Sequence, residues 1–406
     1  MGGRKAPVVT PALPTVAGRP AGLRQPAGRD IPADRSHRPS TVRAGKSRPD
    51  TLILLPSVAL LVIGLLMVFS ASSVQALYET NDAFYYAKRQ FLGAALGLVA
   101  MAVLSRIDYR RLRWLAWPGL LVTVALLVAV LFVGREVAGA RRWIPLGPIN
   151  LQPSELAKLG LILFLAAWLD RRRDMITSFW SGYLPPLLLT GLLFGLVMLE
   201  PDLGTGITLG AIAMVMLFAT GASGWHILLT GFLAIPVVAL LIWIEPYRLR
   251  RIMGFIDPWA DPLDSGFQTI QSLLAVGSGG LFGTGLGQSR QKYFYLPEQH
   301  TDFIFGIVGE ELGFLGAVLV VLFFFILCWR GLRAALRAPD FFGMALATGL
   351  TALIGVQAFL NMGVVTGLLP VTGITLPFLS YGSSSLVVTL AAVGILLNIS
   401  RQGEGP

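Results

Sequence analysis

The sequence predicts an all-α polytopic membrane protein with about ten transmembrane helices, both termini in the cytoplasm, and a large extracytoplasmic loop between helices seven and eight. Of the 406 residues, 54% are hydrophobic and only 13% are charged, whereas soluble globular proteins are about 25% charged. The mean hydropathy is +0.70. Apolar runs of about 20 residues, long enough to cross a bilayer, recur along the chain. This composition excludes an ordinary soluble enzyme.

Residues 1–50 have a different composition from the rest of the chain. They are rich in Pro, Gly, Arg and Ala, and they contain 10 Lys or Arg against 3 Asp or Glu. Such a segment has too few large apolar residues to fold alone, and it lacks the apolar core of a signal peptide. We predict a disordered basic cytoplasmic tail that touches anionic lipid; a partner-binding arm is the alternative. Residues 402–406 form a short C-terminal tail.

Between residues 51 and 401 the apolar runs predict one ten-helix domain. Its abundant Gly and Pro suit closely packed and sometimes broken helices. The fourth run is short and opens with charged residues. The predicted spans are 52–73, 89–105, 115–133, 155–170, 183–199, 203–220, 226–244, 303–329, 342–364 and 379–398.

The distribution of basic residues predicts the orientation. With the N-terminus inside, the inner segments and the tail carry 21 Lys or Arg, and the short outer loops carry about six; basic residues gather on the cytoplasmic side. The excess positive charge therefore faces the cytoplasmic leaflet rather than nucleic acid. The outer side holds the long segment 245–302, which is too apolar and aromatic to be disordered. It predicts short interfacial helices and turns.

The sequence offers no dedicated metal site. Cys328 is the single cysteine, so an internal disulfide, a multi-cysteine zinc site and an iron–sulfur cluster are excluded. The three histidines, His37, His226 and His300, are widely scattered, which argues against a histidine-based metal centre.

Polar residues at membrane depth are costly and are candidates for function. Pro153 suits the first position of a helix. Glu155 and Lys158 are three residues apart and share one face of that helix. Two interpretations stay open: an internal ion pair with a helix cap, or a substrate contact, since a lysine at this depth needs a carboxylate or phosphate partner.

Asp302 stands directly before an apolar helix. It can cap that helix, whose dipole lowers its pKa, or it can act as a catalytic base, with a pKa raised by burial. Further along the same helix, Glu310 and Glu311 are adjacent and are expected to face different ways. At least one is expected to pair with Arg or Lys or to cap a broken helix.

Two glycine-containing segments need separate interpretations. Residues 361–385 interrupt an apolar stretch with Gly, Pro, Ser and Thr, which predicts a re-entrant or kinked segment that lines a cavity; a tight loop between helices is the alternative. Residues 277–287 are glycine-rich but lack the strand–turn–helix context of a nucleotide-binding loop. The Gly and Ser residues near Ser380 do not form a hydrolase elbow for the same reason.

Eight short motifs follow one another along the chain. They are Met67-Val-Phe-Ser-Ala-Ser, Gly139-Ala-Arg-Arg-Trp-Ile, Gln152-Pro-Ser-Glu-Leu-Ala-Lys, Asp257-Pro-Trp-Ala-Asp-Pro, Gly266-Phe-Gln, Leu296-Pro-Glu-Gln-His-Thr-Asp-Phe-Ile-Phe, Glu310-Glu-Leu-Gly and Pro370-Val-Thr-Gly-Ile-Thr-Leu-Pro-Phe-Leu-Ser-Tyr-Gly. Taken in order, these motifs resemble the shape, elongation, division and sporulation (SEDS) family, which includes FtsW, RodA and SpoVE. The resemblance covers about residues 50–401, and Thr375 favours the division and sporulation branches. Ser383 departs from the family pattern, which usually has Gly there.

The resemblance implies a peptidoglycan glycosyltransferase that polymerises lipid II, a disaccharide-pentapeptide on undecaprenyl pyrophosphate, by an inverting transfer. It implies Asp302 as the catalytic base. We expect Lys158, Arg141 and Arg142 to contact the pyrophosphate, with a Lys158–Asp302 pair as the alternative for Lys158. The other substrate-binding candidates are Glu155, Trp143, Gln268, Glu298, His300 and Ser380.

Two other functions stay open, a lipid II flippase and a non-enzymatic division scaffold. A flippase needs polar groups along the whole bilayer depth, whereas here they gather in the predicted outer half. The resemblance implies a class B penicillin-binding protein and other division or sporulation proteins as partners, at the bacterial cell membrane, with the active site on the extracytoplasmic side. A divalent cation, Mg²⁺ or Mn²⁺, could bridge the pyrophosphate.

Overall fold

The computed structural model describes residues 2, 50–137, 139–147 and 149–403. The predicted basic tail over 1–50 and the short C-terminal tail over 402–406 therefore lie almost wholly outside the described residues. The compact part described below begins at Asp50, which caps the first helix by accepting a hydrogen bond from the Leu52 backbone N–H at 2.9 Å.

All ten predicted apolar runs form helices. Among the described residues, eight helical segments are long and apolar enough to cross a membrane, and α6 is a shorter apolar helix. The chain is thus a multi-pass membrane protein, and the full number of ten crossings stays a prediction. The ten helices are α1 (Thr51–Thr80), α2 (Tyr85–Leu104), α3 (Ala116–Val133), α4 (Pro153–Arg171), α5 (Leu184–Leu199), α6 (Leu203–Ala219), α7 (Gly224–Ile244), α10 (Ile304–Leu336), α11 (Phe341–Val365) and α12 (Ser383–Gly403).

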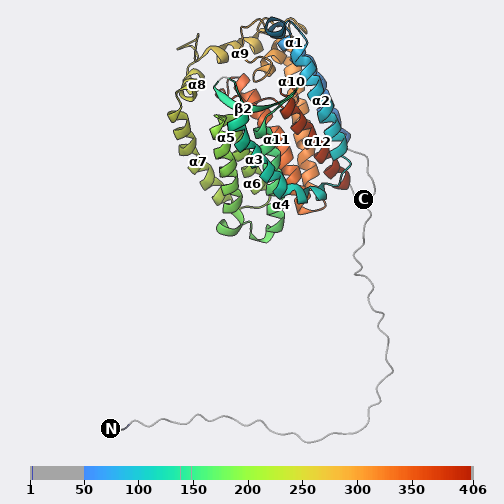
Figure 1. Ribbon diagram of the computed structural model, residues 1–406, viewed down its shortest axis with the longest axis vertical. Coiled ribbons are helices and arrows are strands. Elements are labelled where there is room, and N and C mark those ends of the chain that lie inside the picture. The colour runs from blue at the N-terminus through green and yellow to red at the C-terminus, as the bar shows by residue number, and fades with distance from the viewer. Residues whose placement is uncertain (1, 3–49, 138, 148, 404–406) are drawn as a thin grey trace. The chain divides into compact units, whose positions relative to one another are not determined.

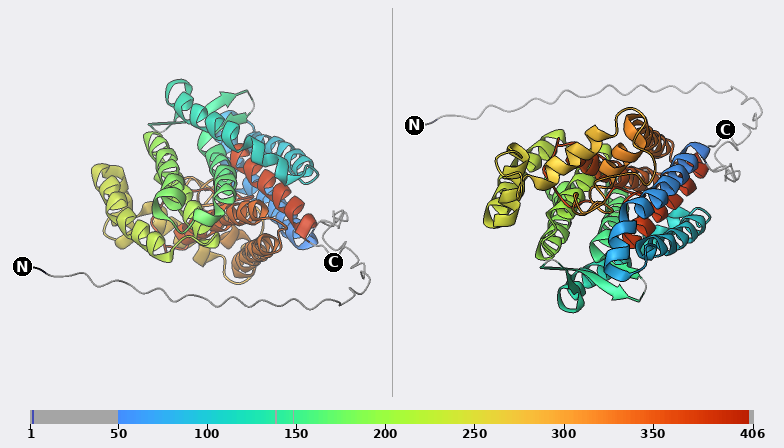
Figure 2. Two further views of the ribbon diagram at one scale, coloured as in Figure 1. Left: turned by 90° about the horizontal axis from the view of Figure 1, so that it is seen from below. Right: turned by 90° about the horizontal axis from the view of Figure 1, so that it is seen from above.

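The helices differ greatly in burial. Nearly every residue of α12 is buried, and α12 packs against α2, α4, α10 and α11. Ser383 is the first residue of α12, and it packs closely against Gly93 of α2. By contrast, no residue of α7 is buried, and both Figure 1 and Figure 2 show α7 at the margin of the bundle.

The long segment 245–302 contains two short helices, α8 (Pro246–Ile256) and α9 (Phe267–Ser278), followed by turns. The prediction of short helices and turns is confirmed. Figure 1 shows α8 and α9 at one end of the bundle, while the connection between α4 and α5 lies at the other end.

The glycine-rich run 277–287 lies against a break in α10. Gly313 has φ 70° and ψ −170°, and it interrupts the helix. The Phe314 and Leu315 N–H groups then donate to Gly280 O at 2.8 Å and Leu281 O at 3.2 Å. A Cβ on Gly279 or Gly283 would collide with the α10 backbone. The glycines therefore allow two backbones to approach closely, so that the polar groups freed by the break find partners.

Glu310 and Glu311 precede this break, and both carboxylates converge on one loop. Glu310 accepts from the Ser289 hydroxyl at 2.5 Å and the Arg290 N–H at 2.8 Å. Glu311 accepts from the Ser70 hydroxyl at 2.6 Å and the Ser289 N–H at 3.2 Å. The expectation that the two face different ways was wrong, and neither forms an ion pair within the described residues. Backbone N–H groups of the loop take the place of a cation.

One small sheet was not predicted. Strands β1 (Arg135–Val137), β2 (Ala140–Leu146) and β3 (Ile149–Leu151) form an antiparallel sheet in the order β1-β2-β3 between α3 and α4. Arg135 pairs with Trp143, and Ile144 pairs with Leu151. The strands are short and interrupted by Gly and Pro, so their alternation is too brief to stand out from a loop.

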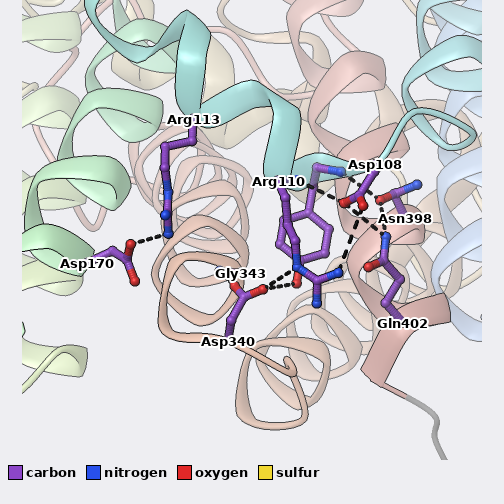
Figure 3. A network of polar contacts seen from close by, with 9 residues as sticks. Asp108, Arg110, Arg113, Asp170, Asp340, Gly343, Asn398 and Gln402 are labelled. Atoms are coloured by element: carbon purple, nitrogen blue, oxygen red, sulfur yellow. Dashed lines mark hydrogen bonds and ion pairs between the residues drawn. The ribbon is translucent and has the colours of Figure 1, made fainter. Parts of the chain in front are cut away.

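The opposite end of the bundle carries an arginine-rich network (Figure 3). It joins the short helix η1 (Tyr109–Leu115), the end of α4, the start of α11 and the end of α12. Asp340 caps α11 through the Gly343 N–H at 2.7 Å and accepts from the Tyr109 hydroxyl at 2.8 Å. The connection between α4 and α5 adds two short helices, η2 (Arg173–Met175) and η3 (Phe179–Tyr183).

We predict that Gly313→Ala destabilises the protein. The backbone at Gly313 lies in a region that only glycine adopts readily, at a cost of about 1–3 kcal/mol for other residues. In addition, a Cβ would lie 2.7 Å from Leu281 O. Thermal unfolding in detergent should give a lower Tm than wild type.

The matched control is Gly210→Ala in α6, where a Cβ meets no atom within 4 Å. This change should leave Tm unchanged or raise it slightly, because alanine favours helix more than glycine does. Equal Tm values for the two variants would contradict the account of the break.

Candidate active site

A cavity of about 870 Å³ lies at the end of the bundle that carries the sheet and α8. The helix starts of α4, α6 and α12 contribute to its wall, together with the irregular segment that precedes α12. Residues 370–375 and 381–385 line the cavity, so the cavity-lining role predicted for residues 361–385 is confirmed for these two parts. The wall is rich in charge. Its charged side chains are Arg89, Arg142, Arg248, Arg251, Glu155, Asp202, Glu245, Glu298 and Asp302.

Asp302 lines this cavity and is half-buried. The helix α10 begins only at Ile304, with Phe303 at the cap position and no capping side chain, so the helix-cap interpretation of Asp302 was wrong. The Asp302 carboxylate receives no hydrogen bond from the described residues. Burial, together with the nearby negative charge of Glu298, raises the pKa of Asp302 to about 7.

The backbone around Asp302 is fixed even though its carboxylate is not. The Asn361 side-chain amide donates to Asp302 O at 2.7 Å and to Ile374 O at 2.7 Å. Ser380 donates to Thr301 O at 2.6 Å and accepts from the Leu376 N–H at 2.7 Å. Ser380 itself is buried outside the cavity lining. These bonds tie the segments on both sides of the cavity together and hold Asp302 at its wall.

Lys158 lies away from the cavity. Its ammonium group forms an ion pair with Glu155 at 2.7 Å, and the two side chains are 1% and 5% exposed. The internal ion pair is therefore confirmed, and the alternative Lys158–Asp302 pair was wrong. Pro153 opens α4 with Glu155 in its first turn, as predicted. Glu155 lines the cavity, so it connects the buried lysine to the site.

The two neighbouring arginines of β2 differ in their surroundings. Arg142 lines the cavity and donates to Glu200 O at 2.8 Å and to Pro201 O at 2.5 Å. Arg141 is exposed and lies 3.4 Å from the Glu136 carboxylate, outside the cavity lining. Of the two arginines, the strand thus places only Arg142 at the site. Trp143 of the same strand also lines the cavity.

The remaining predicted residues divide between the cavity and its support. Glu298 lines the cavity in a left-handed turn with φ 54°, and its carboxylate accepts from the Thr301 hydroxyl at 2.8 Å. His300 is buried beside the rings of Tyr86 and Tyr381, with centroid distances of 4.8 Å and 5.5 Å. Burial lowers the pKa of His300. Gln268 lies in α9, outside the cavity lining.

Sequence reasoning missed several charged residues. Arg248 and Arg251, three residues apart on α8, share one face and line the cavity. Asp202 lines it as the cap of α6, and its carboxylate accepts from the Thr205 N–H at 3.0 Å. Glu200 is fully buried, and neither carboxylate oxygen has a partner among the described residues. The sequence does carry a signal for Glu200 and Asp202, because both carboxylates fall in the short turn between two apolar runs.

Glu200 has a strongly perturbed protonation equilibrium. Burial first, and then the negative charge of Asp202, raises its pKa to about 8. At neutral pH the side chain is therefore mainly a neutral acid. This agrees with its lack of hydrogen-bond partners, since a buried carboxylate without them is costly.

The fold and the site together define a multi-pass membrane protein with a charged cavity at one end of its helix bundle. The chain belongs to the FtsW, RodA and SpoVE family, because the family model described as cell cycle protein matches residues 50–405. This confirms the family resemblance of the motifs.

Individual relatives cover nearly the same part of the chain. It is 50% identical over 360 residues to stage V sporulation protein E of Bacillus subtilis, covering 88% of this chain and 98% of the relative. It is 47% identical to the probable peptidoglycan glycosyltransferase FtsW of Geobacter sp. strain M18, with the same coverage. A chain solved in work on the structural coordination of polymerization and crosslinking by a peptidoglycan synthase complex has a TM-score of 0.72 at 35% identity, covering 88% of this chain and 99% of that one.

We predict that Glu200→Gln flattens the pH dependence of stability. In wild type the folded state keeps the Glu200 proton up to about pH 8, whereas the unfolded state releases it near the ordinary pKa of 4.5. The stability that this group contributes is therefore fully present below pH 4.5 and is lost as pH rises toward 8. The loss is at most about 1.4 kcal/mol per pH unit.

The measurement is Tm in detergent at pH 5 to pH 8. The Tm of wild type should fall relative to that of Glu200→Gln as pH rises. Glu136→Gln, at an exposed carboxylate, serves as the control and should run parallel to wild type. Parallel curves for Glu200→Gln and wild type would show that Glu200 is not held in its neutral form.

Proposed function

We propose that this chain is a peptidoglycan glycosyltransferase that polymerises lipid II, and that the charged cavity is its active site. The observation that carries the proposal is Asp302, a carboxylate without a hydrogen-bond partner among the described residues, with a pKa of about 7, in a cavity with four arginines. The names of the relatives support the same activity.

The reaction joins two lipid II molecules. The 4-hydroxyl of the acceptor N-acetylglucosamine attacks C1 of the donor N-acetylmuramic acid, and the C1–O bond to undecaprenyl pyrophosphate breaks. The linkage changes from α to β, so the transfer is inverting. Asp302 accepts the hydroxyl proton as the oxygen attacks. Such general-base help typically contributes about 10²–10⁴ in rate, and a pKa near 7 leaves a large share of Asp302 ionised at neutral pH.

The leaving pyrophosphate requires positive charge nearby, because electrostatic stabilisation is often the largest contribution to catalysis. Arg142 is suited to this role. Its guanidinium is fixed by two backbone carbonyls, and further N–H donors remain to meet phosphate oxygens. Arg248 and Arg251 face the same cavity from α8.

The wall also offers apolar surface for the undecaprenyl chain. Val238 and Ile242 of α7 line the cavity, and no residue of α7 is fully buried. The charged wall residues gather at one end of the bundle instead of along its whole depth, which favours polymerisation over flipping.

The positive-inside pattern supports a cavity on the extracytoplasmic face of the bacterial cell membrane, where glycan strands are assembled. We propose a class B penicillin-binding protein as the partner, since a similar solved chain belongs to a peptidoglycan synthase complex that couples polymerization to crosslinking. Other division or sporulation proteins complete the proposed set of partners.

For the divalent cation, we propose that Mg²⁺ or Mn²⁺ arrives with the pyrophosphate of the substrate. In the described part of the chain, no group of three His, Cys, Asp or Glu side chains could hold a metal ion. The mechanism proposed here therefore uses only side chains of the chain itself.

We predict that Asp302→Asn strongly slows glycan polymerisation. The asparagine keeps the size of the side chain but cannot accept the proton, so the rate should fall by about 10²-fold or more. The assay is polymerisation of lipid II by the purified chain with and without its transpeptidase partner. Asp264→Asn, an exposed residue of the same long segment, is the control and should keep wild-type activity.

Full activity in a folded Asp302→Asn variant would remove Asp302 from the mechanism. If wild type gave no product even with the partner, flipping or scaffolding would replace polymerisation as the proposed function.

We also predict that substitutions of the neighbouring residues Arg141 and Arg142 have very different effects on kcat. Arg142→Gln removes a cavity-facing cation and should lower kcat by about 10²-fold, whereas Arg141→Gln changes an exposed residue and should stay close to wild type. Steady-state kinetics with lipid II would compare them directly. Equal losses would contradict the assignment of Arg142, and not Arg141, to the pyrophosphate.

A further inference from the structure

A second cavity, of about 520 Å³, opens at the arginine-rich end of the bundle. It lies in the network drawn in Figure 3, among η1, the end of α4 and the start of α11. Its lining has three arginines and one carboxylate, so it favours an anion. The lining residues are Arg110, Arg113, Trp114, Arg171 and Asp340.

Arg110 and Arg113 are held in place by neighbouring carboxylates and retain donors that these contacts do not use. Arg110 Nε donates to Asp340 Oδ2 at 2.7 Å (Figure 3). Asp340 is itself fixed by the Tyr109 hydroxyl at 2.8 Å and the Gly343 N–H at 2.7 Å. Arg110 also forms an ion pair with Asp108 at 3.9 Å. A guanidinium has five N–H donors, so these two contacts leave some of the Arg110 donors available.

Arg113 lines the cavity and is fixed by two contacts. Its Nη2 donates to the Asp170 carboxylate, and its guanidinium lies 5.1 Å from the centroid of the Phe342 ring. Its Nε is buried, so the remaining Nη donors are the ones that a ligand can reach. Arg171 forms no ion pair within the described part of the chain. A phosphate group, with several acceptor oxygens, fits this set of donors.

The surroundings favour a lipid over a free anion. Trp114 is 83% exposed at the mouth of the cavity. Trp117 and Leu121 follow it at helical spacing on α3 and are also exposed. Tryptophan is enriched at the level of lipid headgroups. An apolar surface therefore runs from the cavity toward the bilayer core, where acyl chains lie.

We propose that this cavity binds the headgroup phosphate of an anionic glycerophospholipid, such as phosphatidylglycerol, from the leaflet that the charge pattern predicts to be cytoplasmic. The headgroup contacts Arg113 and Arg171, and its acyl chains lie along α3. Because the network joins η1, α4, α11 and α12, the bound lipid stabilises the packing of their ends. This site is independent of the proposed glycosyltransferase function.

The test is thermal unfolding of the full purified chain in detergent, titrated with dioleoyl phosphatidylglycerol, dioleoyl phosphatidylcholine or inorganic phosphate. Phosphatidylglycerol alone should raise Tm at low concentration. Arg113→Gln and Arg171→Gln should each weaken the apparent affinity for it about fivefold. Arg173→Gln, an exposed arginine on the same face but outside the cavity lining, should behave as wild type.

Equal protection by phosphatidylcholine would overturn the proposal, and so would equal phosphatidylglycerol affinity in Arg171→Gln and Arg173→Gln. If inorganic phosphate raised Tm as much as phosphatidylglycerol does, the cavity would be assigned to a free anion, and the proposal of a bound lipid would be overturned. Arg171→Gln keeps the test decisive if Arg113→Gln fails to fold, because Arg171 holds no ion pair within the described residues.

Discussion

The cost of burying charge inside a bundle of apolar helices is the constraint on which this structure depends. A buried ion without partners costs several kcal/mol, and the chain meets this cost in different ways. Lys158 and Glu155 pair with each other at 2.7 Å. Glu310 and Glu311 instead gather N–H and hydroxyl donors from Ser70 and the loop that ends at Arg290. That loop can reach them because Gly313 breaks α10 and the glycine-rich run packs against the break.

Glu200 and Asp302 differ from these paired or hydrogen-bonded charges, and both lie at the same end of the bundle. Glu200 is buried without a hydrogen-bond partner in the described part of the chain and has a pKa of about 8, so its proton removes the charge. Asp302 has a pKa of about 7 and faces a cavity, where a substrate hydroxyl can reach it. Asn361 and Ser380 fix the backbone beside Asp302 and leave its carboxylate unpartnered among the described residues. A fixed backbone beside an unpartnered carboxylate suits the general base that we propose, which must reach the proton of the substrate hydroxyl.

The sequence predicted the helices well because long apolar runs are a strong local signal, and the motif around Asp302 pointed to the cavity. Other features depend on tertiary contacts. Whether Lys158 pairs with Glu155 or with Asp302 cannot be decided from helix spacing alone. Arg141 and Arg142 are adjacent residues of the same type, so the sequence does not distinguish them. Only the pairing of β2 shows that Arg141 is exposed and that Arg142 lines the cavity. The convergence of Glu310 and Glu311 required knowledge of a distant loop.

The most direct test of the account is the pH dependence of kcat/KM for lipid II polymerisation between about pH 5 and pH 8, since this quantity reports the essential base of the free enzyme. The base must be ionised, so the rate should fall about tenfold per pH unit below an apparent pKa near 7. Glu298→Gln should move this fall in rate to lower pH, because the Glu298 charge raises the pKa of Asp302. A flat wild-type profile over this range would contradict the assignment of Asp302 as the catalytic base.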